Sequence, residues 1–147
     1  MTNENTSELD FDGINDQVTI QTSSTINWTS NGNFSWSIWF KVKDNSTRIV
    51  NYGLFQTHGD GERGIIIGLN NTNTIYVSTQ NTSGTIEYIY ANNTPSNNRW
   101  YYLAVNYYNK SVDIYLNTTL VANNSFKGNA NTGFITSVSL IGDESAI

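Results

Sequence analysis

The residues with the clearest chemical potential are aromatic rings that lie near side-chain amides between positions 88 and 108. Five of the seven rings in this stretch are candidates, and a sixth candidate lies in an Asn-rich segment upstream: Tyr88, Tyr90, Trp100, Tyr102, Tyr108 and Trp28. The nearby amides are those of Asn92, Asn97, Asn98 and Asn106. An exposed ring can stack on the face of a sugar while amides bond its hydroxyls. We predict these six rings as candidate glycan-binding residues, with the alternative that many of them are core or ordinary sheet-face residues.

The carboxylates are too isolated along the sequence for hydrolytic chemistry. Hydrolysis of a glycosidic bond needs two carboxylates that flank it. Glu87 stands alone on its expected strand, and Asp113 has Ser111 and Tyr115 two residues to either side. The single histidine, His58, lies in a Gly-rich stretch, and no nucleophile elbow accompanies it. The sequence therefore predicts that this protein is not an enzyme.

Asparagine supplies a second recurring motif. Ten of the 23 Asn residues begin an Asn-x-Ser/Thr acceptor sequence, where random placement would give about five. Eight of them are predicted glycosylation sites: Asn27, Asn45, Asn70, Asn81, Asn92, Asn109, Asn117 and Asn123. A heavily glycosylated surface is one interpretation. An Asn- and Thr-rich surface whose acceptor sequences are unused is the other, and both stay open.

Composition excludes several classes of partner. The net charge is −5 and only 13% of the 147 residues are charged, whereas duplex binding draws its affinity from clustered Lys and Arg. We therefore expect no nucleic-acid partner. Cysteine is absent, so every site that needs a thiolate is excluded. No apolar stretch approaches the length of a membrane span, and residues 1–10 do not have the pattern of a signal peptide.

Alternation of apolar and polar residues at a period of two predicts the elements that carry these groups. Residues 100–117 predict a hairpin with a loop at 108–111. Residues 34–42 predict a strand with Phe34, Trp36, Ile38, Phe40 and Val42 on one face, and with Trp39, Ser35, Ser37 and Lys41 on the other. No helical period of useful length occurs. We expect a flexible segment at 1–8 and a single all-β domain at 9–147, in the form of a sandwich or jelly roll.

Four motifs also occur in a characteristic order. They are LDFDGINDQVTI at 9–20, FSWSIWFKV at 34–42, RWYYLAVNYYNKSVDIYLNTTLV at 99–121 and SVSLIGD at 137–143. Together they resemble laminin-G-like domains of the concanavalin-A-like lectin and glucanase superfamily. The resemblance implies a two-sheet antiparallel jelly-roll sandwich.

The chain departs from this family in two places. Thr118 occupies a turn position where the family has Gly, and a β-branched residue tolerates positive φ poorly, so we expect a longer turn or a different type. The sequence also stops at Ile147, before the family's usual closing strand. Trimming, a shortened fold, or completion by a neighbouring subunit would each explain this. The segment 9–13 would then be partly unpaired, and an unpaired strand edge favours self-association.

The resemblance also implies a metal. Many laminin-G-like domains bind calcium at the rim through an Asp that precedes a short apolar strand, together with loop carbonyls. Asp60 has that place before GERGIIIGL, Glu62 is its substitute, and residues 81–84 would supply a carbonyl. The alternative is that Asp60 and Glu62 belong to a solvated turn.

These observations favour a non-catalytic, extracellular binding or adhesion module that recognises a glycan or a glycosylated partner. The alternative is a structural subunit of a glycosylated surface filament, coat or viral fibre that self-associates. Either function places the protein outside the cell or at a cell or virion surface.

Overall fold

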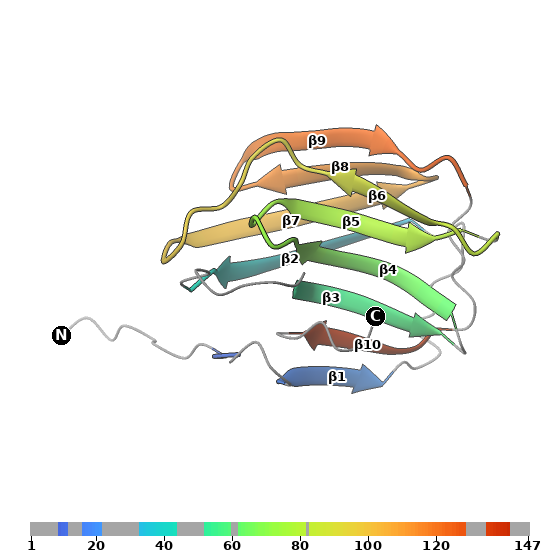
Figure 1. The fold of residues 1–147 in the computed structure, drawn as a ribbon, viewed down its shortest axis with the longest axis horizontal. Helices are drawn as coiled ribbons and strands as arrows, with labels where there is room; N and C mark the ends of the chain where they lie inside the picture. Colours follow the sequence, from blue (N-terminus) through green and yellow to red (C-terminus); the bar gives the residue numbers. More distant parts are fainter. Residues whose placement is uncertain are drawn as a thin grey trace.

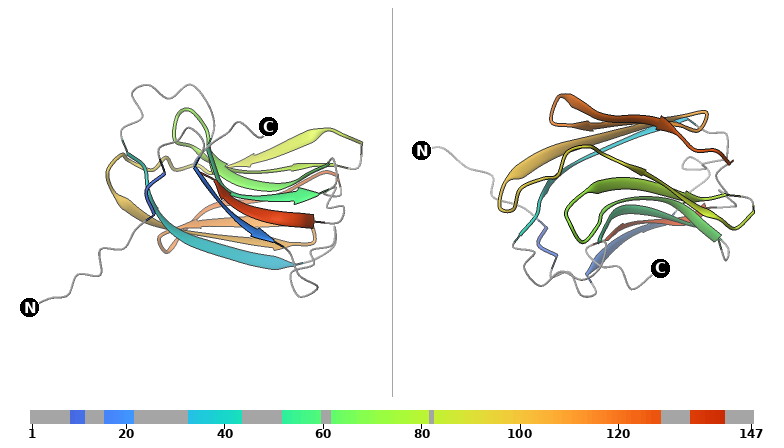
Figure 2. Two further views of the ribbon diagram at one scale, coloured as in Figure 1. Left: turned by 90° about the horizontal axis from the view of Figure 1, so that it is seen from below. Right: turned by 45° about the horizontal axis from the view of Figure 1, so that its top comes forward.

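In the part of the chain that the structure describes, ten antiparallel strands form two sheets that face each other (Figures 1 and 2). The structure, a computed structural model, describes residues 9–11, 16–21, 33–43, 52–59, 62–81, 83–128 and 135–141, and these contain no helix. The six-stranded sheet has the order β1 (Gln17–Gln21), β10 (Ile135–Ile141), β3 (Tyr52–Gly59), β4 (Glu62–Leu69), β5 (Ile75–Gln80) and β6 (Ile86–Tyr90). The four-stranded sheet has the order β2 (Phe34–Lys41), β7 (Trp100–Tyr108), β8 (Ser111–Leu116) and β9 (Thr119–Ser125).

The core is the apolar layer between the two sheets. Successive side chains of a strand point to opposite faces, and the inward set of β7 includes Leu103 and Val105, both fully buried. Across the layer, the ring of Trp36 on β2 lies 5.1 Å from that of Phe55 on β3, centroid to centroid. The predicted two-sheet antiparallel sandwich is confirmed.

The predicted hairpin is present, but its loop is shorter than expected. Tyr108 and Ser111 are cross-strand partners, so that only Asn109 and Lys110 connect β7 and β8. Both have positive φ, 44° and 73°, which is the conformation of a two-residue turn that matches the twist of the strands.

The turn between β8 and β9 explains how Thr118 is accommodated. Leu116 pairs with Thr119, and the connection consists of Asn117 and Thr118. Asn117 takes the positive φ of 57°, whereas Thr118 does not adopt one. Asn tolerates this region much better than a β-branched residue does, so the turn is of a different type, as expected.

The chain crosses from the six-stranded sheet to the four-stranded sheet beside the edge strands β6 and β9. The amide of Asn92, just beyond β6, donates to the carbonyl of Val121 on β9 over 3.0 Å. Residues 91–99 then lead to β7 in the four-stranded sheet (Figure 1). At the other edge, β1 pairs with β10 alone among the described strands, and residues 9–11 lie outside any strand.

A close backbone approach occurs where β3 and β4 pair with an irregular register. The side chain of Thr57, on β3, is fully buried, and its Oγ1 accepts a hydrogen bond from the amide of Ile65 over 2.8 Å. A Cβ at Gly64 would lie 1.9 Å from that same Oγ1 and 2.6 Å from the carbonyl oxygen of Thr57. Only glycine leaves room for the Thr57 side chain here.

We predict that Gly64→Ala lowers the free energy of unfolding by ~1–3 kcal/mol, because the added methyl group overpacks this site. Urea unfolding measures the change. The double variant Thr57→Ala/Gly64→Ala should regain part of the lost stability, because the contact with Thr57 Oγ1 is removed. The recovery should be incomplete, because the contact with the carbonyl oxygen of residue 57 remains. A Gly64→Ala protein as stable as the parent would contradict the close approach.

Candidate functional site

The predicted aromatic residues do not form one site, because the structure distributes them over two opposite outer faces. Trp100 and Tyr102 lie on the outer face of the four-stranded sheet, whereas Tyr88 and Tyr90 lie on the outer face of the six-stranded sheet. Tyr108 is 65% exposed at the far end of β7 from Trp100, about 26 Å away along the strand. Trp28 lies outside the described residues. The two pairs therefore belong to separate surfaces, and their role in glycan binding stays a prediction.

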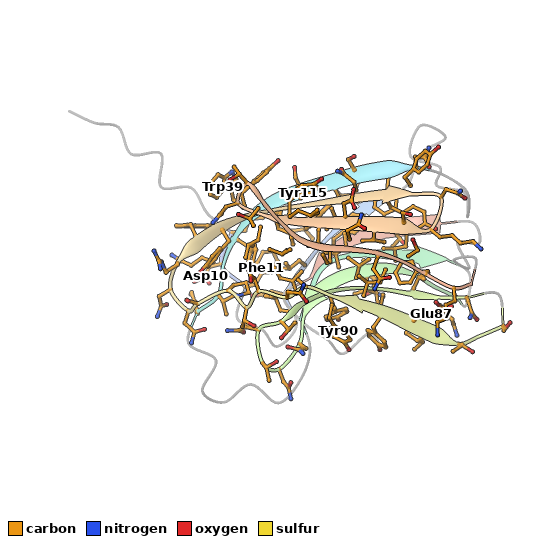
Figure 3. All side chains as sticks on the ribbon, turned by 90° about the horizontal axis from the view of Figure 1, so that it is seen from above. Asp10, Phe11, Trp39, Glu87, Tyr90 and Tyr115 are labelled. Atoms are coloured by element: carbon orange, nitrogen blue, oxygen red, sulfur yellow. The ribbon has the colours of Figure 1, made fainter. Side chains whose placement is uncertain are left out.

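The outer face of the four-stranded sheet carries a group of exposed and half-buried side chains, most of them aromatic, which we call the Trp39 surface. Its members are Trp39, Lys41, Trp100, Tyr102, Tyr115 and Leu120. The ring of Trp39 is 63% exposed and rests against that of Tyr102, with centroids 5.4 Å apart and planes inclined by 48°. Figure 3 shows Trp39 and Tyr115 on one side of the sandwich and Tyr90 on the opposite side.

Four members of this surface were not selected from the sequence: Trp39, Lys41, Tyr115 and Leu120. For Trp39 and Lys41 the signal was available, because the alternation along residues 34–42 directs both away from the core. Leu120 could not have been assigned in the same way. The register of β8 and β9 shifts next to Ile114, and this irregularity pairs Leu120 with Tyr115 on the outer face.

Polar and positively charged groups surround the rings. The side-chain amide of Asn123 donates to Asp113 over 2.6 Å on the same face. At the other end, Lys41 Nζ lies 4.9 Å from the centre of the Trp100 ring, a distance typical of a cation–π contact. Arg99 is exposed beside Trp100, and Lys43 pairs with Asp10 over 2.5 Å. In a chain of net charge −5, this end of the surface is locally basic.

The tyrosines on the other face pack mainly on one another. Tyr76 is only 2% exposed, and its ring lies 5.8 Å from that of Tyr88 at an interplanar angle of 61°. Tyr88 and Tyr90 are stacked, with centroids 5.7 Å apart. Burial raises the pKa of Tyr90, and the neighbouring Tyr88 adds to the rise. The adjoining recess, about 10 Å³ in volume, is too small for a sugar ring.

Neither predicted calcium ligand has a described side chain. Asp60 lies outside the described residues, and Glu62 begins β4 but its side chain is not described. No group of three or more His, Asp or Glu that could hold a metal occurs among the side chains that are described. Calcium at Asp60 and Glu62 therefore stays a prediction.

Glu87, the solitary carboxylate on β6, holds the segment that follows β9. It accepts hydrogen bonds from the amides of Lys127 over 2.6 Å and of Gly128 over 2.9 Å, and from Asn81 Nδ2 over 3.1 Å. Burial alone would raise the pKa of Glu87, but these bonds favour the carboxylate and bring the pKa below its ordinary value of 4.5. Glu87 thus has a structural role.

We predict that Glu87→Gln lowers the free energy of unfolding by ~1–2 kcal/mol near neutral pH, because an amide is a weaker acceptor for backbone amides than a carboxylate is. The native pKa is lowered, so this stabilisation is present above about pH 4.5 and is lost as the pH falls through the native pKa. Urea unfolding at a series of pH values should show the variant and the parent converging in acid.

Lys127→Ala is the matched control for this test, since it keeps the backbone amide that bonds Glu87 and removes only the side-chain charge, which is the smallest of the causes that lower the Glu87 pKa. It should cost less than Glu87→Gln. A difference between Glu87→Gln and the parent that is the same at all pH values would contradict the assigned role.

The predicted glycosylation sites differ in whether their side-chain amides already make hydrogen bonds within the protein. Asn81 accepts bonds from the amides of Ser83 and Thr85 while its Nδ2 donates to Glu87. By contrast, Asn92 and Asn109 are exposed. Asn70, Asn117 and Asn123 also lie in described segments, and Asn27 and Asn45 lie outside them. Use of these acceptor sites stays a prediction.

The fold is that of a lectin-like β sandwich. The chain belongs to the family described as the concanavalin A-like lectin/glucanases superfamily, whose Laminin_G_3 model matches residues 12–146. No curated protein sequence matches it. Within the described residues there is no helix long and apolar enough to cross a membrane.

Solved structures with the same fold include toxin binding domains. The binding domain of Paraclostridial Mosquitocidal Protein 1 is 18% identical with a TM-score of 0.65, over 84% of this chain and 32% of that one. The binding domain of botulinum neurotoxin DC in complex with rat synaptotagmin II is 15% identical with a TM-score of 0.68, over 84% and 31%. The chain therefore spans about a third of these domains.

A third similar structure is closer to this chain in size. It is the CBM40 of Ruminococcus gnavus IT-sialidase bound to α2,3-sialyllactose, which is 15% identical with a TM-score of 0.58, over 84% of this chain and 77% of that one. At these identities the shared property is the fold.

Proposed function

We propose that this protein is a non-catalytic, extracellular module that binds a glycan or a glycosylated partner through the Trp39 surface. The observation that carries the proposal is the Trp39 ring, which is 63% exposed and held in place by Tyr102. A large aromatic ring exposed on a sheet face costs solvation free energy, so a ligand that covers it is favoured. Sugars fit this position because one face of the ring is apolar and its edge bears hydroxyls.

The groups around the rings match the rest of a glycan. Ser35 and Ser37, exposed on β2, and the Asp113–Asn123 pair offer donors and acceptors for hydroxyls. Lys41 and Arg99, at the Trp100 end, favour a carboxylate on the ligand. Two neighbours in fold agree with this class of ligand: the sialidase CBM40 bound to sialyllactose, and a botulinum neurotoxin type C whose cell entry depends on two ganglioside molecules.

The hydrogen bonds of two described carboxylates support the non-catalytic part of the proposal. Glu87 is engaged by two backbone amides, and Asp113 accepts from Asn123. Neither forms a carboxylate pair across a cleft, which glycoside hydrolysis requires. Calcium bound by Asp60 and Glu62, and glycans on Asn-x-Ser/Thr sites away from the ligand surface, such as Asn109, belong to the same proposal.

A self-associating surface subunit is the second candidate function. The observation that favours it is the position of β1, which has a described partner on one side only. Such an edge can pair with the edge of another copy. Light scattering distinguishes the two candidates, since a monodisperse monomer at high concentration would contradict self-association.

We predict that Trp39→Ala weakens glycan binding by about tenfold or more, because stacking on the ring is lost. A printed glycan array with neutral and sialylated sugars, probed with and without chelator, measures the effect. Stability should change little, since the side chain is mostly exposed.

Tyr90→Ala is the matched control, because it removes a half-exposed ring from the opposite face and should leave binding unchanged. Equal losses in the two variants would contradict the assignment to the Trp39 surface. Absence of binding to any sugar on the array by the parent protein would contradict the proposed function.

A further inference from the structure

A groove of about 290 Å³ lies beside the Trp39 surface, where the chain leaves β6 and passes along the edge strand β9. Its lining residues are Asn92, Asn93, Thr119, Leu120, Val121, Ala122 and Asn123. Leu120 belongs to both features, because it lines the groove and pairs with Tyr115 on the outer face of the sheet. The groove is therefore continuous with the Trp39 surface.

The wall of the groove formed by Asn92 and Asn93 is held from both sides. On the near side, the Asn92 amide bonds the carbonyl of Val121. Farther along the same connection, Pro95 is fully buried and Asn97 Oδ1 accepts from the buried Asn73 over 2.9 Å. A wall anchored in this way is formed before a ligand arrives, which reduces the entropy cost of binding.

The far end of the connection is hydrogen-bonded to β7 and to Val42, the residue just beyond β2. The Ser96 amide donates to the Tyr101 hydroxyl over 3.0 Å, and this bond is the main reason that the pKa of Tyr101 is lowered. The Asn98 amide donates to the Val42 carbonyl over 2.6 Å. The connection is thus tied to β6, β9, β7 and the end of β2.

The lining chemistry selects a neutral, polyhydroxylated ligand. Asn92, Asn93 and Asn123 contribute side-chain amides to the lining, although the Nδ2 of Asn123 also donates to Asp113. Leu120 adds an apolar contact that is 49% exposed. Among the described residues, none that lines the groove is charged. A charged ligand would lose hydration here without a compensating partner, whereas sugar hydroxyls can bond the amides directly.

We propose that this groove is a second subsite of the Trp39 surface, so that the ligand is an oligosaccharide that lies across the strands from Trp39 to Asn93. The proposal rests on the proposed function, because the groove extends the surface assigned there. Three strand spacings separate β2 from β9, about 14 Å, which is several times the width of one sugar ring. Sugars at the Trp39 end stack on rings, and neutral sugars at the groove end bond amides.

The test uses nested sets of sugars. The probes are cello- and malto-oligosaccharides from disaccharide to hexasaccharide, and lactose with its sialylated and N-acetyllactosamine-extended forms, measured by array and then by calorimetry. The protein is made in a bacterial host, because Asn92 and Asn123 are both predicted acceptor sites. We expect affinity to rise with ligand length. The double variant Asn92→Ala/Asn93→Ala should bind the longer ligands about tenfold more weakly than the parent does. Binding of the shortest ligand should not change.

Asn124→Ala is the matched control, since Asn124 is exposed on β9 but does not line the groove. It should behave as the parent does at every ligand length. Affinity independent of length, or equal losses for short and long ligands in the double variant, would overturn the second subsite while leaving the proposed function in place. Absence of binding to every sugar would overturn both.

Discussion

The apolar layer between the two sheets is the constraint on which every other feature depends. Successive residues of a strand point to opposite faces, so burial of Leu103 and Val105 obliges Tyr102 and Ala104 to face outward. The same rule applied to β2 buries Phe40 and exposes Trp39. A shift of the β2 register by one residue would expose Phe40 and bury Lys41. Hydrophobic burial therefore specifies which rings are presented to solvent.

The second determinant is the path of the chain between the sheets. Tyr90 and Trp100 are ten positions apart, yet residues 91–99 carry the chain from one sheet to the other. The same connection builds the groove, because its first residues are bonded to β9 and its last residues to β2 and β7. One segment thus separates two sets of rings and adds an amide-lined wall to one of them.

Two acidic residues, Glu87 and Asp113, make hydrogen bonds within the protein. Glu87 joins the segment after β9 to β6 through backbone amides, and its carboxylate is stabilised by that contact. Asp113 pairs with Asn123 at the margin of the outer face. Neither carboxylate is arranged for acid–base chemistry, and the exposed rings beside Lys41 and Arg99 are consistent with recognition. The function proposed for the Trp39 surface therefore needs no reacting group.

The sequence by itself determined the antiparallel sandwich, because a two-residue period along 34–42 and 100–117 is a local property that each strand carries. It also determined the β7–β8 pairing and, through Thr118, the unusual turn that follows. Only the tertiary structure decided that Tyr88 and Tyr90 lie opposite Trp100, that Leu120 joins the outer face, and that Asn92 and Asn93 form a wall. These depend on which sheet a strand joins and on an irregular register. Such relations arise from contacts between segments distant in sequence, and no local pattern records them.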